Sequence, residues 1–246
     1  MKKFLLLLKH EYNGMFLPLC IIIAALAILQ IILFSNALRG DYFNAPFSHY
    51  VNSARISAVF AIAYAGLLVL MGVRFLRNFA PSKNIYALLT IPVKRGHVYL
   101  AELAAALIAG FVLLAAQMAI VLLLYMQFWA FGPETGRRGA GLYLALLDVG
   151  FLRLLFPPDF LSLLFTFLGF FGSVSVTFFA AVKLKSGGVV SAIILSAVWL
   201  VLLLWSFPIG SFGYAGNAIA FALMLAIPVI AAIRGVKLFE SGEVAR

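Results

Sequence analysis

The chain has 246 residues, of which 65% are apolar and only 11% are charged. Soluble domains are about 45–50% apolar and about 25% charged, so this composition excludes an ordinary water-soluble enzyme or nucleic-acid-binding domain. The net charge of +10 fits a membrane protein instead, because basic residues collect beside the cytoplasmic leaflet. The sequence therefore predicts an all-α integral membrane protein with a single transmembrane domain over residues 1–246.

Residues 1–14 are basic and apolar but too charged to cross a membrane. Four basic residues fall in pairs that are two helical turns apart, Lys2 with Lys9 and Lys3 with His10. This spacing puts them on one face of a helix and predicts an amphipathic connecting helix in the inner interface. Its candidate functional residues are Lys2, Lys3, Lys9 and Glu11. We expect Gly14 and Pro18 to mark the turn into the first span. The alternative is a basic anchor that fixes topology and does nothing more.

A membrane-spanning helix needs about 20 mostly apolar residues. Six stretches qualify, at about residues 16–34, 56–73, 101–128, 160–182, 189–207 and 215–233. With the N-terminus inside, six spans place most of the 18 lysines and arginines on the cytoplasmic side, which is the usual bias. We therefore expect a multi-pass protein of the bacterial cell membrane with both termini in the cytoplasm.

Residues 141–156 are nearly apolar enough to form a seventh span. They contain Asp148 and Arg153, and a crossing at this point would abolish the bias of basic residues toward the inside. A charge at mid-membrane also costs about 2.5–3.5 kcal/mol. We therefore expect an external helix between spans three and four.

The segment between spans two and three mixes bulky apolar residues with basic ones. Ser82 is suited to cap a short helix that Pro92 would end. Such a helix would present Ile85, Tyr86 and Leu89 together at helical spacing. Apolar groups on the water side of a membrane protein need covering, so the segment predicts a docking site for a partner. The alternative is that these groups pack against the ends of the chain's own spans.

The sequence offers little catalytic or metal chemistry. It has no G-x-x-x-x-G-K-[ST] phosphate loop, so we expect no ATP hydrolysis by that route. Its three histidines are scattered, and its single cysteine, Cys20, lies within an apolar run. We therefore predict no catalytic residues, no metal ligands and no cofactor bound by this chain.

Four polar residues interrupt the apolar spans: Gln30, Glu102, Gln117 and Asn217. Glu102 alone among the eight acidic residues falls within a predicted span, at the inner end near Lys94 and Arg95. Carriers driven by protons or ions usually place carboxylates inside their spans. The scarcity of acids disfavours such a carrier, but an ion-coupled carrier or channel using Glu102 stays open.

One stretch resembles a known family. It reads Leu88-Leu-Thr-Ile-Pro-Val-Lys-Arg-Gly-His-Val-Tyr-Leu-Ala-Glu102. In permease subunits of the ABC-2 type exporter family, a Leu-Pro-Val-(Ser/Thr)-Arg element follows a short coupling helix and leads into the third span. Ile91–Arg95 resembles that element, with Ile in place of Leu and Lys in place of Ser or Thr. The layout also looks similar, and the size is similar to that of small permease subunits of Gram-positive peptide exporters, including the phenol-soluble-modulin exporter.

The resemblance implies the permease half of an ATP-driven exporter. Two permease subunits, either two copies or a copy and a paralogue, would pair with two separate ATPase subunits that bind ATP and Mg. The connecting helix would lie against a coupling helix at residues 77–92, seated on the ATPase. The residues implied in coupling are Arg77, Asn78, Phe79, Ser82, Lys83, Ile85, Tyr86, Leu89, Pro92 and Arg95. The apolar spans, rich in the 24 phenylalanines, favour a hydrophobic or amphipathic substrate such as a peptide, antimicrobial or toxin. Membrane lipid is expected as a partner, and nucleic acid is not.

Overall fold

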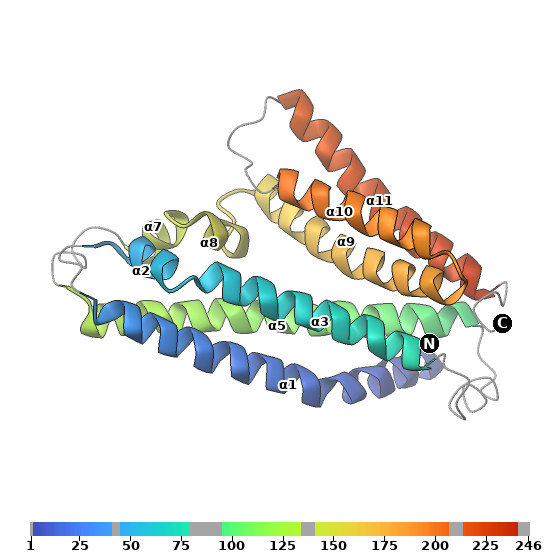
Figure 1. Cartoon of the computed structure of the whole chain (residues 1–246), viewed down its shortest axis with the longest axis horizontal. Coiled ribbons are helices and arrows are strands. Elements are labelled where there is room, and N and C mark those ends of the chain that lie inside the picture. The colour runs from blue at the N-terminus through green and yellow to red at the C-terminus, as the bar shows by residue number, and fades with distance from the viewer. Residues whose placement is uncertain (1, 41–44, 79–94, 134–140, 207–213, 241–246) are drawn as a thin grey trace. The chain divides into compact units, whose positions relative to one another are not determined.

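The structure is a computed structural model that describes residues 2–40, 45–78, 95–133, 141–206 and 214–240. This part of the chain is built of helices and contains no strand (Figure 1), so the all-α prediction is confirmed. The helices are α1 (Lys2–Leu38), α2 (Phe47–Ser53), α3 (Ile56–Asn78), α5 (Arg95–Phe131), α7 (Leu142–Leu147), α8 (Gly150–Leu155), α9 (Phe160–Lys185), α10 (Val189–Ser206) and α11 (Tyr214–Glu240).

Five helices in the described part are long and apolar enough to cross a membrane. They are the stretches Phe4–Leu38, Ile56–Arg77, Gly96–Phe131, Phe160–Lys185 and Phe221–Leu238. Many of their large apolar side chains, such as Ile62 and Leu17, are exposed, as contact with lipid requires. These helices identify a multi-pass membrane protein. Val189–Leu203 in α10 is apolar but shorter, so a sixth span stays a prediction.

The first helix differs from the prediction. We expected a turn at Gly14 and Pro18, but α1 continues through both residues as one helix of 37 residues. A proline within a membrane helix is tolerated because neighbouring groups satisfy the carbonyl that it leaves without a partner. The predicted connecting helix and first span therefore share one element.

The predicted external helix at residues 141–156 forms two short helices, α7 and α8. They are separated at Asp148 and Val149, and Val149 has extended backbone angles of φ −103° and ψ 117°. The extended residue at this point ends the ladder of hydrogen bonds, so the two helices are distinct. Leu146, Leu152 and Leu155 are their buried anchors.

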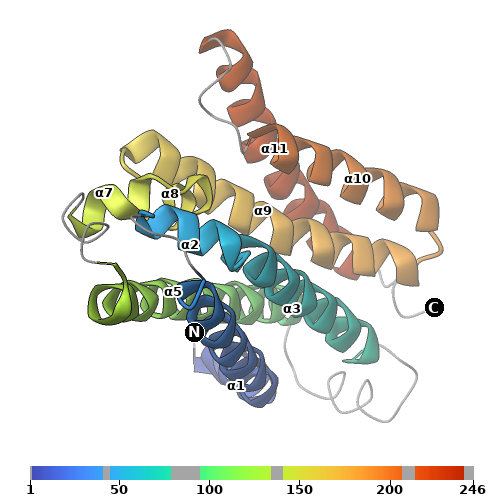
Figure 2. The same ribbon diagram turned by 60° about the vertical axis from the view of Figure 1, so that its left-hand side comes forward.

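The chain divides into two compact units, and the division falls within α1, α3, α5 and α9. The first unit contains residues 1–15, 68–109 and 167–246, and the second contains residues 16–67 and 110–166. In the first unit, α9 and α10 lie side by side (Figure 1, Figure 2). The indole Nε1 of Trp199 on α10 donates a hydrogen bond of 3.1 Å to the Ser173 hydroxyl on α9. A Cβ at Gly172 would lie 2.0 Å from the Trp199 ring and 2.8 Å from Pro228 of α11. Gly172 therefore lets the three helices pack closely.

A buried amide pair joins α1 to α5 in the second unit. Gln30 Nε2 donates to Gln117 Oε1 at 3.1 Å, and Gln117 Nε2 donates back to Gln30 Oε1 at 3.1 Å. Gln30 Nε2 also donates to the carbonyl oxygen of Ile56, 3.3 Å away. Both side chains are fully buried, so this reciprocal pair fixes the register of the two helices.

Helix α2 was not predicted from the sequence. Its buried Phe47 and Tyr50 pack against Phe34 of α1 and Phe128 of α5, with ring centroids 5.6–6.4 Å apart. The signal in the sequence is the spacing of Phe47, Tyr50 and Val51, which puts three apolar side chains on one helical face after Pro46.

Candidate functional site

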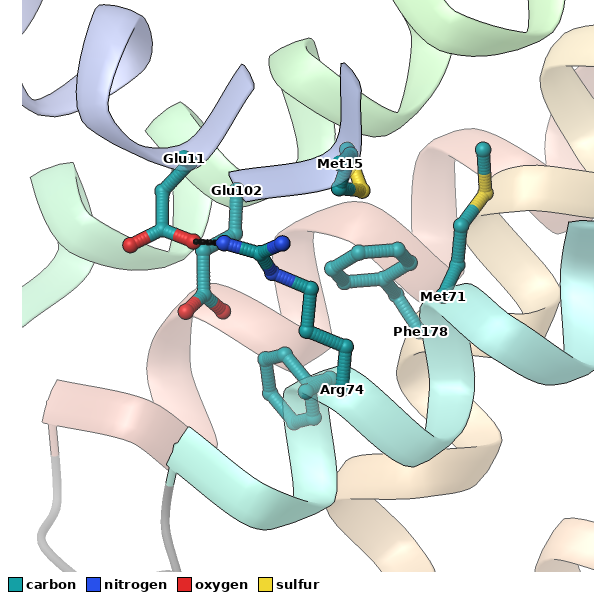
Figure 3. A pocket seen from close by; sticks show the side chains of 7 residues that line it. Glu11, Met15, Met71, Arg74, Glu102 and Phe178 are labelled. Atoms are coloured by element: carbon teal, nitrogen blue, oxygen red, sulfur yellow. Dashed lines mark hydrogen bonds and ion pairs between the residues drawn. The ribbon is translucent and has the colours of Figure 1, made fainter. Parts of the chain in front are cut away.

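Three charged side chains line one small pocket in the first unit (Figure 3). Glu11 comes from α1, Arg74 from α3 and Glu102 from α5. The remaining walls are apolar and are made by Met15, Met71, Phe75 and Phe178. In Figure 3 the Arg74 guanidinium points toward the Glu11 carboxylate, and a dashed line marks the interaction between them. We call Glu11, Arg74 and Glu102 the charged cluster.

An ion pair holds the first and third helices together in this cluster. Arg74 Nη2 lies 3.4 Å from Glu11 Oε2, and the Arg74 side chain is 26% exposed while that of Glu11 is 8% exposed. Glu102 is 4% exposed and lines the same pocket. The cluster thus contains two carboxylates and one guanidinium. Burying a charge is costly unless opposite charge and hydrogen bonds compensate it, so the buried Glu11 carboxylate depends on Arg74.

Gly14 makes room for the guanidinium. A Cβ at Gly14 would lie 2.0 Å from Arg74 Nη2 and 2.6 Å from Arg74 Cζ. Real Cβ atoms do not approach other atoms so closely, so any side chain at this position would displace the guanidinium. Gly14, which we expected to mark a turn, therefore leaves space for the guanidinium of the ion pair.

Three aromatic rings pack directly beside the charged cluster. Phe75 and Phe178 have ring centroids 5.2 Å apart, and Tyr99 lies 6.1 Å from Phe75 and 6.3 Å from Phe178, all in edge-on arrangements. A Cβ at Gly235 on α11 would lie 2.3 Å from the Tyr99 hydroxyl oxygen. Helices α1, α3, α5, α9 and α11 therefore meet at this end of the first unit.

Most of the residues predicted to couple to a partner fall outside the described part of the chain: Phe79, Ser82, Lys83, Ile85, Tyr86, Leu89 and Pro92. Arg77 is exposed in the last turn of α3. Asn78 ends α3 and Arg95 begins α5, but their side chains are among those not described. The docking helix itself therefore stays a prediction.

The residues predicted for the connecting helix have different environments. Lys9 and His10 are exposed, as expected for groups facing lipid headgroups or water. Glu11 is buried in the charged cluster. Lys2 and Lys3 lie in or at the start of α1, and their side chains are not described.

Two of the four polar residues predicted to lie within the spans contact each other in the structure. Gln30 and Gln117 contact each other, whereas Glu102 lies with Arg74 in the pocket. The expected neighbours of Glu102, Lys94 and the Arg95 side chain, are outside the described set. Asn217 lies in α11, and its side chain is not described either.

Sequence reasoning did not single out Arg74 or its pairing with Glu11. The sequence does contain a signal for this pair, because the predicted topology places few acidic residues on the cytoplasmic side. Only Glu11 and Glu102 occur there before the C-terminal Glu240 and Glu243. Acidic residues so close to apolar spans need a cation nearby, and Arg74 immediately follows the second span.

Among the described residues, no group of three or more His, Cys, Asp or Glu side chains is placed to hold a metal ion. The chain matches no protein-family model, no curated protein and no solved structure. The resemblance to a family therefore rests on the sequence alone, above all on Leu88–Glu102.

Proposed function

We propose that the chain is the membrane-spanning permease half of an ATP-driven exporter of the ABC-2 type. A second permease subunit completes the pathway, and two separate ATPase subunits bind ATP and Mg and hydrolyse the nucleotide. The chain itself is not an enzyme in this proposal. The resemblance of Leu88–Glu102 to the family element and the set of apolar helices support it.

The observation that carries the proposal is the position of the charged cluster around the predicted docking segment. Arg74 lies one turn before the end of α3 at Asn78, and Glu102 lies two turns after α5 begins at Arg95. The segment between these two helices is the one predicted to seat on an ATPase. Because Arg74 also pairs with Glu11, a displacement of the segment would reach α1, α3 and α5 together. Coupling between sites is carried by such chains of packed and paired side chains.

The substrate class follows from the lining that such a pathway would have. Apolar and aromatic side chains dominate the spans, which suits an amphipathic peptide, an antimicrobial or a toxin better than a sugar or a small ion. The direction of transport, outward, follows from the family resemblance.

The proposal is tested by co-expression with a candidate ATPase subunit. We expect the ATPase to co-purify with the wild-type chain and to hydrolyse ATP faster when substrate is present. Tyr86→Ala and Arg77→Glu should weaken this complex, by about 30-fold or more if Tyr86 anchors the contact. Tyr143→Ala is a matched control, because Tyr143 is exposed on α7 in the other unit. The proposal fails if no ATPase co-purifies, or if both variants keep the complex and its activity intact.

A second candidate function is supported by the burial of Glu102 within a candidate span. A carboxylate in such a place is a feature of ion-coupled carriers and channels. Proteoliposomes that contain the chain without an ATPase provide the test. Transport driven by an ion gradient, and abolished by Glu102→Gln, would favour this function over the exporter.

A further inference from the structure

The charges of the first unit are sorted by sign. Its two acidic residues whose side chains are described, Glu11 and Glu102, are both buried. Its exposed lysines and arginines are Lys9, Arg77, Lys185, Arg234 and Lys237. Within the described side chains of this unit, none of the exposed charges is acidic. We call these five residues the basic cluster.

The basic cluster lies at one end of the unit. Arg77 is two residues after Phe75, and Arg234 directly precedes Gly235. Phe75 and Gly235 both lie against Tyr99. Lys9 is two residues before Glu11, which pairs with Arg74, and Lys185 ends α9 two turns after Phe178. The contacts among the five helices therefore gather these cations at the same end.

Three of these cations mark the points where apolar helices stop. The candidate spans Ile56–Arg77, Phe160–Lys185 and Phe221–Leu238 end at or beside Arg77, Lys185 and Lys237. Exposed apolar side chains lie within about one turn before these cations along the helices, including Val73, Leu184 and Ile233. Such side chains belong in hydrocarbon, and a cation about one turn further along then lies at the depth of the lipid headgroups.

We propose that the basic cluster binds the phosphate groups of anionic phospholipids in one leaflet, and that these lipids stabilise the folded chain. The lipid phosphate provides the negative charge that this surface lacks. An acidic protein surface would offer the same charge, but it would leave the adjoining apolar side chains uncovered. A bilayer covers both kinds of group at once. Each lysine or arginine near an anionic surface contributes about a fivefold gain in affinity.

The test uses the full chain, purified in a neutral detergent and titrated with phosphatidylglycerol or phosphatidylcholine. Retained lipid is counted by native mass spectrometry, and the thermal midpoint is followed in parallel. We expect wild type to retain phosphatidylglycerol in preference and to gain thermal stability from it. Lys185→Gln/Arg234→Gln should weaken the binding about 25-fold, and raising the ionic strength should weaken it in wild type without any substitution.

The matched control is Arg39→Gln/Arg55→Gln, which removes the same charge from exposed positions of the second unit. That unit also exposes Asp148 and Asp159, so we expect its variant to retain phosphatidylglycerol as wild type does. Lys185→Arg, which keeps the charge, should also retain it and shows that position 185 tolerates exchange.

Three results would overturn the proposal. Equal retention of the two lipids by wild type would show that the surface does not select anionic headgroups. Equal loss in both double variants would show a general effect of net charge. A Lys185→Gln/Arg234→Gln variant that keeps the lipid but loses a co-expressed ATPase would assign the cluster to a protein partner. None of the lipid measurements requires an ATPase, so they separate this inference from the proposed function.

Discussion

Arg74 of α3 and Glu11 of α1 approach to 3.4 Å between Nη2 and Oε2, and this ion pair links two helices that are 63 residues apart in sequence. Glu102 lines the same pocket, so one guanidinium faces two buried carboxylates. The Glu11 side chain is 8% exposed and that of Arg74 is 26% exposed, so the carboxylate is the more buried partner of the pair. This asymmetry gives the first prediction.

Arg74→Gln should destabilise the chain more than Glu11→Gln. The first substitution leaves the Glu11 carboxylate, 8% exposed, without its guanidinium, whereas the second leaves the Arg74 guanidinium, 26% exposed, where water still reaches it. Removing one partner of a fully buried ion pair costs about 3–5 kcal/mol, and because Arg74 is partly exposed we expect about 2 kcal/mol here. Thermal unfolding in detergent measures the difference.

Two further variants make this prediction specific. Arg77→Gln, at an exposed position three residues away, should change the thermal midpoint little. Arg74→Gln/Glu11→Gln should recover part of the lost stability because no buried carboxylate is then left without the guanidinium that pairs with it. Equal midpoints for the Arg74 and Arg77 variants would contradict the assignment.

Gly14→Ala should loosen the ion pair without changing any charge. The new Cβ would lie 2.0 Å from Arg74 Nη2, so the guanidinium must move away from Glu11. The guanidinium is the flexible end of its side chain, so the cost is the weakened ion pair, about 1 kcal/mol at this partly exposed site. It offsets the gain in helix stability that alanine brings at any helical position. Gly66→Ala is the matched control, because Gly66 is exposed in α3 and a Cβ added there would meet no atom within 4 Å. There, alanine should stabilise the helix by about 0.5–1 kcal/mol. Gly66→Ala should therefore raise the midpoint of thermal unfolding more than Gly14→Ala does, and equal gains in the two variants would argue against the role of Gly14.

The sequence predicts the helices well because long apolar runs leave the backbone no other way to satisfy its hydrogen bonds in lipid. Residues 56–73 and 160–182 were expected to be helical, and α3 and α9 contain them. Contacts between distant residues are different. Gln30 and Gln117 are conspicuous in the sequence, but they are 87 residues apart, and only the packing of α1 against α5 brings them together.

Two sequence-based predictions of local structure were wrong or missing, and each has a physical cause. Gly14 and Pro18 were expected to break the helix, as they often do in water. The structure instead uses Gly14 as space for Arg74 and continues the helix through Pro18. Helix α2 was missed because its apolar spacing, Phe47, Tyr50 and Val51, covers little more than one turn of a seven-residue helix and is a weak signal. Its position is held by aromatic contacts that the sequence does not reveal.

Replacing both glutamines of the amide pair should be tolerated better than replacing one. Gln30→Leu leaves the buried amide of Gln117 without its partner, and Gln117→Leu does the same to Gln30. Each single substitution should cost about 1–2 kcal/mol. In Gln30→Leu/Gln117→Leu no buried amide is left over, so the double variant should be more stable than the sum of the two single effects. A double-mutant cycle on unfolding midpoints measures this, and strictly additive effects would show that the pair contributes nothing.

The start of α9 should respond to pH through Asp159. The backbone N–H of Ser162 donates to Asp159 Oδ1 at 2.6 Å. Hydrogen bonds from Ser162 hold the pKa of Asp159 below its ordinary value, the side-chain bond with the larger effect and the backbone bond with the smaller. A lowered pKa in the folded state means that the capping interaction is fully present above the unfolded pKa of about 3.9 and is lost as the pH falls through the lower folded pKa.

Hydrogen exchange at the amides of residues 160–163 measures the effect. Asp159→Ala should speed exchange there at every pH, whereas Asp159→Asn should keep the cap and remove its acid sensitivity. Asp148→Ala, at another exposed aspartate, should leave this exchange unchanged, and identical exchange in wild type and Asp159→Ala would show that Asp159 does not cap α9.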